Sequence, residues 1–186
     1  MCQSQSEQQW VNEVKDLFPD KFQGADVLDV GSANLNGTYK PFFSQNGCSS
    51  YTGIDVAPFN NVDVVGPVHE YNPDKKFDIV FSASQLEHDM YWKKSLMKFV
   101  ELCKPGGMII ISAWCALDFH GTKEEQPLTS LTSNLDNEWS QYYENRSVED
   151  IKSIWTPKML KQTFKEYFLG MNPHDDGNVV FWGVKK

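Results

Sequence analysis

Two aspartates at the ends of short apolar runs suit the binding of a nucleoside. Asp29 lies in Val27-Leu28-Asp29-Val30-Gly31 and Asp55 ends Tyr51-Thr52-Gly53-Ile54-Asp55, and each run reads as a buried strand. In an open α/β sheet, ligands bind just outside the carboxyl ends of the strands. A carboxylate at the tip of the second strand accepts hydrogen bonds from ribose hydroxyls. The pair therefore predicts a nucleoside site.

The loop after the first strand favours a ligand without phosphates. A dinucleotide needs glycines here, because the backbone must approach the pyrophosphate closely. The loop from Gly31 to Gly37 has Ala33 where the second such glycine would stand. S-adenosylmethionine has a ribose, an adenine and a sulfonium but no phosphate, so it fits better. A nicotinamide-dinucleotide oxidoreductase stays open as an alternative, as does a non-catalytic protein that keeps the fold as a binding module.

The segments that must position these residues alternate between strands and helices. Apolar residues at helical spacing predict helices over 6–18 and 91–103, and a short helix is expected between Gly37 and Asn46. This alternation predicts a parallel sheet with right-handed crossovers. The predicted strands are Asp26–Val30, Ser50–Asp55, Val62–Val65, Phe77–Ser82 and Met108–Ala113, with a turn at 104–107 before the last of them.

The last third of the chain is of two kinds. Residues 115–153 are polar and carry little periodicity, so we expect an inserted substrate or lid segment, ending in a short helix capped by Ser147 and Asp150. Thr156-Pro157 predicts the start of another helix. Residues 167–169 and 178–184 read as an antiparallel hairpin.

The composition is that of one soluble globular domain over residues 1–186, with a helical region at 1–24. The net charge of −8 makes nucleic acid an unlikely partner. The four cysteines show no paired spacing, and no apolar run reaches the roughly 20 residues of a membrane helix. We expect a cytoplasmic protein without membrane contact, and the oligomeric state stays open.

Two histidines lie beside acidic residues in the sequence. His120 follows Asp118, and His174 precedes Asp175 and Asp176. Loop histidines beside acids are more often solvated than bound to metal. We therefore expect no metal site.

Several short motifs, in this order, resemble those of a class I S-adenosylmethionine-dependent methyltransferase, in particular the small single-domain kind often labelled type 11. The resemblance implies a Rossmann-like three-layer α/β/α sandwich, with a mostly parallel seven-stranded sheet of order 3-2-1-4-5-7-6 and an antiparallel last strand. The motifs are Leu28-Asp29-Val30-Gly31, Asn36-Gly37-Thr38, Tyr51-Thr52-Gly53-Ile54-Asp55, Val62-Asp63-Val64-Val65, Phe77-Asp78-Ile79-Val80, Leu86-Glu87-His88-Asp89, Cys103-Lys104-Pro105-Gly106-Gly107 and Trp155-Thr156-Pro157.

The resemblance also implies a set of residues that bind S-adenosylmethionine. Asp29 and Gly31 would lie near the methionine ammonium, and Asp55 would accept from the ribose. Residues 67–69 would lie against the adenine, although Gly66 stands where the family often has an acid. The full expected set is Asp29, Gly31, Ser32, Ala33, Asn36, Gly37, Asp55, Val56, Pro67, Val68, His69, Ser82, Ser84 and His88.

Methyl transfer from a sulfonium is an in-line displacement, so the protein mainly aligns the acceptor and excludes water. A hydroxyl or amine acceptor calls for a base, and His88 or His120 is the predicted catalytic residue. For His88, a capping or packing role is an equal alternative. The acceptor is expected to be a small molecule or a glycan, with a lipid precursor also open.

Overall fold

The computed structural model describes residues 4–35, 37–115, 139, 142–174 and 177–186. A seven-stranded sheet of order β3-β2-β1-β4-β5-β7-β6 runs through it. The strands β1 to β5 pair in parallel, and β7 is antiparallel to both of its neighbours, β5 and β6. The predicted order and the predicted antiparallel hairpin are confirmed. The strands are β1 Asp26–Val30, β2 Ser50–Asp55, β3 Val64–Val65, β4 Phe77–Ala83, β5 Cys103–Trp114, β6 Phe164–Met171 and β7 Asn178–Lys185.

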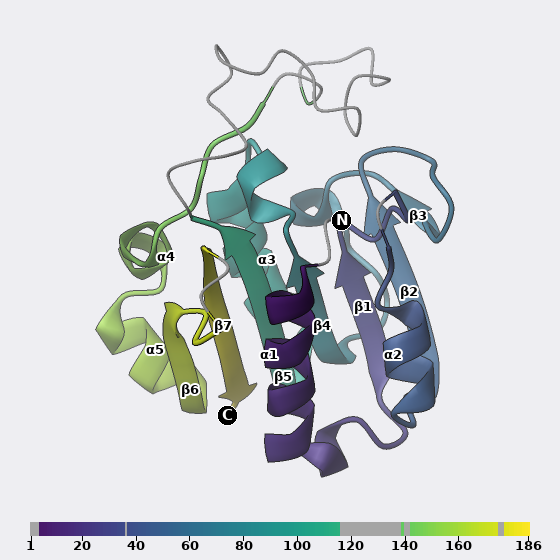
Figure 1. The fold of residues 1–186 in the computed structure, drawn as a ribbon, viewed down its shortest axis with the longest axis horizontal. Helices are drawn as coiled ribbons and strands as arrows, with labels where there is room; N and C mark the ends of the chain where they lie inside the picture. The colour runs from purple at the N-terminus through teal and green to yellow at the C-terminus, as the bar shows by residue number, and fades with distance from the viewer. Residues whose placement is uncertain (1–3, 36, 116–138, 140–141, 175–176) are drawn as a thin grey trace.

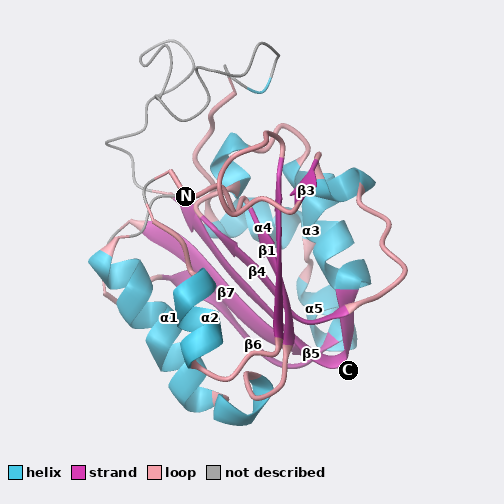
Figure 2. Ribbon diagram, turned by 90° about the vertical axis from the view of Figure 1, so that its right-hand side faces the viewer, coloured by secondary structure: helices cyan, strands magenta, loops and turns pink. Residues whose placement is uncertain are grey.

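Helices cover both faces of the sheet, which gives the predicted three layers (Figures 1 and 2). The helices α1 and α2 lie on one face, and α3, α4 and α5 lie on the other. Their bounds are α1 Gln5–Leu17, α2 Lys40–Gln45, α3 Trp92–Leu102, α4 Val148–Ile154 and α5 Pro157–Thr163, with 3-10 turns η1 Pro19–Lys21, η2 Val68–Glu70 and η3 Leu86–His88. Among the described residues, none of the helices has the length and apolar character to cross a membrane.

Two of the predicted helix caps are present. Ser147 accepts a hydrogen bond from the backbone of Asp150, whose carboxylate accepts from the backbone of Ser147 in return, so α4 begins with a capping box. The Thr156 side chain accepts from the Met159 amide at 3.3 Å and caps α5, with Pro157 as its first residue.

Both faces of β5 are buried, as its unbroken apolar run predicts. Ile109 and Ile111 pack in the cluster under α3, whereas Met108 and Ile110 pack in the cluster under α1. Strand residues alternate between the two faces, so one strand supplies both halves of the core. The sheet is therefore a rigid base for the loops at its edges.

The third, fifth and sixth strands differ from their predicted bounds, and β6 runs over Phe164–Met171 rather than only 167–169. β3 is only Val64–Val65, because Asp63 instead accepts a hydrogen bond from the Gly53 amide at 2.7 Å. β5 begins at Cys103, which pairs with Phe77 before the pairing jumps to Met108. The predicted turn at 104–107 is thus a bulge inside the strand, with Gly106 at a φ of +76°.

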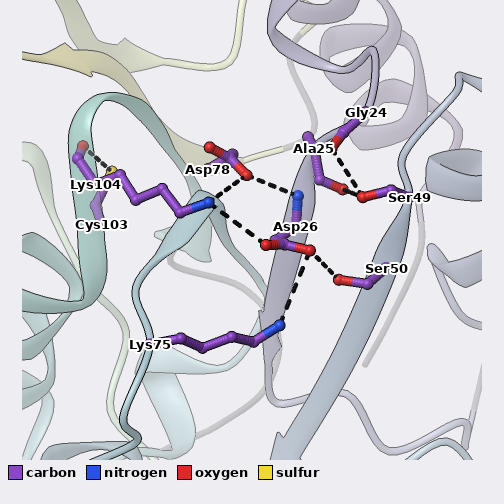
Figure 3. A network of polar contacts seen from close by, with 9 residues as sticks. All are labelled: Gly24, Ala25, Asp26, Ser49, Ser50, Lys75, Asp78, Cys103 and Lys104. Atoms are coloured by element: carbon purple, nitrogen blue, oxygen red, sulfur yellow. Dashed lines mark hydrogen bonds and ion pairs between the residues drawn. The ribbon is translucent and has the colours of Figure 1, made fainter.

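The parallel strands leave the sheet with two different edges. We call the edge where β1, β2, β4 and β5 end the carboxyl edge, and the opposite one the amino edge. At the amino edge, Asp26 pairs with Lys104 and Lys75 and accepts from Ser50, while Asp78 binds Lys104 and the Asp26 amide (Figure 3). Asp26 and Asp78 are thus both partnered, and the contacts of Asp26, with the Ser50 hydroxyl foremost, hold the pKa of Asp26 below its ordinary value.

Candidate functional site

Asp29 is buried at the carboxyl edge with one of its carboxylate oxygens unpartnered. Its Oδ2 accepts a hydrogen bond from the Tyr51 hydroxyl, whereas Oδ1 has no hydrogen-bond partner among the described residues. The residue is 0% exposed, and this burial raises the pKa of its carboxyl to about 7. A buried polar atom without a partner is costly, so Oδ1 is suited to receive a donor from a ligand.

Asn61 holds this arrangement from the loop after β2. Its side-chain Nδ2 donates to the Tyr51 hydroxyl oxygen at 2.9 Å and to the Ser32 carbonyl at 3.0 Å. The Ser32 hydroxyl donates back to the Asn61 carbonyl at 3.0 Å. Asn61 has a φ of 74°, in the left-handed region, which asparagine tolerates better than most residues. A Cβ on Gly53 would lie 2.1 Å from the Asn61 carbonyl, so only glycine allows this approach.

Asp55 binds the loop that follows β1. Its Oδ2 accepts from the Ala33 amide at 3.2 Å, and burial raises the pKa of its carboxyl. The amide that would face a pyrophosphate in a dinucleotide site therefore faces a carboxylate here. Such an environment disfavours a phosphate, because two anions would be brought together.

Gly31 follows β1 and packs against Gln85, which lies just after β4. Its φ is +79°, and a Cβ there would lie 2.5 Å from Cγ of Gln85. The Gln85 side chain also accepts from the Ser82 hydroxyl at 3.3 Å and donates to Asp89 at 3.1 Å. Gly31 and Ser82, both expected in the cofactor site, thus lie against the same glutamine.

A second buried carboxylate, Glu7 from α1, reaches this edge. Its Oε2 accepts from the Ser84 hydroxyl at 3.0 Å and from the Ser112 hydroxyl, and its Oε1 accepts from the Tyr39 hydroxyl at 2.8 Å. Ser84 has a φ of 49°, a conformation that is uncommon outside glycine and concentrates at functional sites. The N-terminal helix therefore contributes to the site.

Glu87 and His88 lie in the turn η3, just beyond β4, and differ in burial. Glu87 is 1% exposed, and its Oε2 has no hydrogen-bond partner among the described residues. Burial raises the pKa of Glu87 to about 7. The His88 ring is only partly buried and packs edge-on against the Tyr143 ring, with centroids 4.9 Å apart.

The residues expected near the adenine lie beside the end of β2. The Gly66 amide donates to the Asp55 carbonyl at 2.8 Å, which places the following residues at this strand end. Val68 is buried in the core, and the His69 ring lies 4.6 Å from the Tyr91 ring. The Tyr91 ring in turn lies 5.7 Å from that of Trp139, so aromatic rings border this side of the edge.

The structure thus brings most of the predicted residues to one edge of the sheet. Other residues at this edge were not predicted from the sequence. Those missed are Glu7, Tyr51, Asn61, Gln85 and Glu87. A signal for Glu7 existed, because it shares a helical face with Trp10, Val11 and Val14. Asn36 and His120, both predicted site residues, lie outside the described residues.

The comparisons with known proteins bear on this geometry. A model of a methyltransferase domain family matches residues 2–167. The chain belongs to this family. The predicted membership of the class I methyltransferases is confirmed. Among curated proteins, none matches the chain.

Solved structures of methyltransferases share the fold of this methyltransferase domain at low sequence identity. A 1,6-didemethyltoxoflavin-N1-methyltransferase from Burkholderia thailandensis, with S-adenosylhomocysteine bound, is 16% identical over 98% of this chain and 79% of its own, with a TM-score of 0.65. The N-methyltransferase NodS from Bradyrhizobium japonicum WM9, also with S-adenosylhomocysteine, is 14% identical over 98% and 88%, with a TM-score of 0.61. Magnesium protoporphyrin IX methyltransferase from Synechocystis PCC 6803, with S-adenosylmethionine bound, is 16% identical over 97% and 80%, with a TM-score of 0.60.

Proposed function

We propose that this methyltransferase domain binds S-adenosylmethionine at the carboxyl edge and transfers its methyl group to a small molecule or a glycan. The observation that carries the proposal is Asp29, a buried carboxylate with one oxygen held by Tyr51 and the other unpartnered among the described residues. The similar structures that hold S-adenosylmethionine or S-adenosylhomocysteine support this choice of cofactor.

The residues present fit the cofactor's amino acid tail. An ammonium group would donate a charge-assisted hydrogen bond to Oδ1 of Asp29. Gly31, with its positive φ, allows the backbone to turn beside that group. We assign Asp29, Gly31, Ser32, Ser82 and Ser84 to the tail. Asp55 and Val56 are assigned to the ribose, and Pro67, Val68 and His69 to the adenine.

When bound, the cofactor supplies an already activated methyl group on a sulfonium. The chain's own residues therefore need to align the acceptor with that group and to exclude water. A catalytic role for His88 or His120 stays a prediction, applicable to a hydroxyl acceptor that must lose a proton. If the double substitution of both histidines by alanine left the rate on the true acceptor unchanged, neither would be the base.

Small acceptors are favoured over macromolecules by two observations. The net charge of −8 opposes binding to a phosphate backbone. The similar structures include enzymes named for 1,6-didemethyltoxoflavin and for magnesium protoporphyrin IX, both of which are small molecules. We also propose that residues 115–153 select the acceptor, since specificity in this fold comes from loops beyond the strand ends.

The decisive experiment is a thermal unfolding titration with S-adenosylhomocysteine, the expected product. At about 100 times its dissociation constant, the ligand should add roughly 2.7 kcal/mol of stability. A parallel titration with NADH tests the oxidoreductase alternative, which the carboxylate facing Ala33 disfavours. Stabilisation by NADH alone, or by neither ligand at millimolar concentration, would overturn the proposal.

A further inference from the structure

Two buried carboxylates at the carboxyl edge, Glu7 and Glu87, are not among the residues that we assign to the cofactor's tail. Both carboxylates accept hydrogen bonds from the end of β5. Glu7 accepts from the Ser112 hydroxyl, and Glu87 accepts from the backbone of Trp114, two residues further along the strand. Residues two apart on a strand are roughly 7 Å from each other, so the two carboxylates are neighbours. The negative charge of Glu7 contributes to the raised pKa of Glu87, in agreement with this closeness.

Glu87 lies farther from Asp29 along the sheet edge than Glu7, whose charge contributes to the raised pKa of Asp29 as well. Asp29 belongs to β1, which is separated from β5 by β4. Two strand spacings amount to roughly 10 Å. The pair therefore lies beside the end of β4, past the carboxylate that we assign to the cofactor's ammonium.

Glu87 is the member of the pair with a carboxylate oxygen, Oε2, that has no partner among the described residues. Its Oε2 is buried and accepts no hydrogen bond from the described residues. Arg146, a buried cation among the described residues of this region, contacts other groups. Its guanidinium pairs with Glu144 at 2.8 Å and donates to the Leu86 carbonyl at 3.1 Å, while stacking over the Trp92 ring.

A buried carboxylate oxygen without a hydrogen-bond partner is unfavourable until a donor reaches it. Within the described part of the chain, no group of three or more ligating side chains could hold a metal ion. An organic ammonium needs fewer partners, since each of its N–H groups donates to a single oxygen. Glu87 Oε2 can accept one such bond directly.

We propose that Glu87, supported by Glu7, recognises a positively charged amine on the methyl acceptor, so that the enzyme is an N-methyltransferase. This inference rests on the proposed function. The ammonium docks on the Glu87 carboxylate and passes one proton to it. The freed nitrogen lone pair then forms the C–N bond to the methyl carbon, while the S–C bond breaks with its electrons onto sulfur, which becomes a neutral thioether.

The raised pKa of Glu87, about 7, suits this proton transfer, because its carboxylate can take up a proton near neutral pH. The buried residue is therefore assigned to the acceptor nitrogen. Its neighbour His88 packs against Tyr143.

The experiment compares three ligands that share the same adenosine and amino acid parts. S-adenosylhomocysteine has a neutral sulfur, S-adenosylmethionine has the methylated sulfonium, and sinefungin has a CH–NH2 group in place of S–CH3. The ammonium of sinefungin thus occupies the position of the methyl group that is transferred. It is directed at the position that the acceptor nitrogen would occupy. Dissociation constants are measured by calorimetry at pH 8 for the wild type, Glu87→Gln, Glu7→Gln and the exposed-residue control Glu166→Gln.

We expect the wild type and Glu166→Gln to bind sinefungin about fivefold more tightly than S-adenosylhomocysteine, because its ammonium lies next to the place of the acceptor nitrogen and is attracted by the charge of the Glu87 carboxylate. Glu87→Gln should reduce this preference to about twofold, and Glu7→Gln should reduce it less. The affinity for S-adenosylhomocysteine should stay unchanged in Glu87→Gln, which also shows that the variant is folded.

Two outcomes would overturn the inference. One is a sinefungin preference that is absent in the wild type or unchanged in Glu87→Gln. The other is an equal loss of S-adenosylmethionine and sinefungin affinity, because the carboxylates would then serve the donor sulfonium. Failure of all three ligands to bind the wild type would instead refute the proposed function.

Discussion

Both edges of the sheet carry carboxylates, but these differ in burial, in their partners and in the direction of their pKa shift. Asp26 and Asp29 lie three positions apart on the same strand, β1. Asp26 at the amino edge has lysine and serine partners and a lowered pKa, whereas Asp29 at the carboxyl edge is buried, without a lysine, arginine or histidine partner among the described residues, and has a raised pKa. Paired carboxylates join the strands, and unpaired ones are available to a ligand.

The backbone shows the same contrast. At the carboxyl edge, Asn61 and Ser84 are the described non-glycine residues with positive φ, at 74° and 49°. Both are tied by side-chain hydrogen bonds into the network around Asp29 and Glu7. Strained residues persist where surrounding contacts over-determine them, and such sites are commonly functional. The amino edge is thus built for stability, and the carboxyl edge holds its residues in place for a ligand.

The substitution Asp29→Asn is the strongest test of this difference between the edges. It keeps an acceptor for the Tyr51 hydroxyl but removes the negative charge. We expect the affinity for S-adenosylhomocysteine to fall about 100-fold, because a charged hydrogen bond to its ammonium is lost. The melting temperature of the ligand-free protein at pH 8 should rise by several degrees, because a buried unpaired charge is removed. A variant that melts lower and binds as well as the wild type would show that Asp29 is structural.

Removing the partner of Asp29 should have a smaller effect. Tyr51→Phe deletes the hydrogen bond to Oδ2, which stabilises the charged form, so the pKa of Asp29 should rise further. We expect about tenfold weaker binding of S-adenosylhomocysteine at pH 7, partly recovered at pH 8.5. Calorimetric titration at both pH values measures this recovery. An equal loss of affinity at both would show that the substitution does not act through the pKa of Asp29.

The pH dependence of the wild type tests the raised pKa directly. A carboxyl whose pKa is raised from 3.8 to about 7 on folding holds its proton more tightly in the folded state. Its contribution to the free energy of unfolding is therefore lost as pH rises from about 4 to 7. Ligand binding needs the charged form, so affinity for S-adenosylhomocysteine should fall up to about tenfold between pH 8 and pH 6. Asp29→Asn should abolish this dependence on pH.

The smallest effects are expected at the amino edge. Asp26→Asn weakens partly exposed ion pairs with Lys75 and Lys104, each worth up to about 1 kcal/mol. Chemical denaturation should show a loss of about 1 kcal/mol in unfolding free energy. The affinity for S-adenosylhomocysteine should stay within about twofold of the wild type. A tenfold loss of affinity would show that the amino edge also takes part in ligand binding, contrary to the proposed difference between the edges.

Much of the fold could be predicted because it depends on local patterns. Apolar runs marked β1 and β2 to the residue, and the caps at Ser147 and Thr156 marked the starts of α4 and α5. β3 came out shorter than predicted, because Asp63 bonds to the Gly53 backbone, ten residues away in the chain. No local pattern reports such a contact.

By itself, the sequence determined the order of the elements and placed Asp29 and Asp55 at strand ends, because periodicity and turn residues act over a few neighbours. Only the tertiary structure decided which carboxylates are paired. It brought Glu7 from the first helix to Ser84 and Ser112, and buried Glu87 rather than the neighbouring His88. Burial and charge pairing depend on residues far apart in the chain, and these set whether a carboxylate stabilises the fold or is available to a ligand.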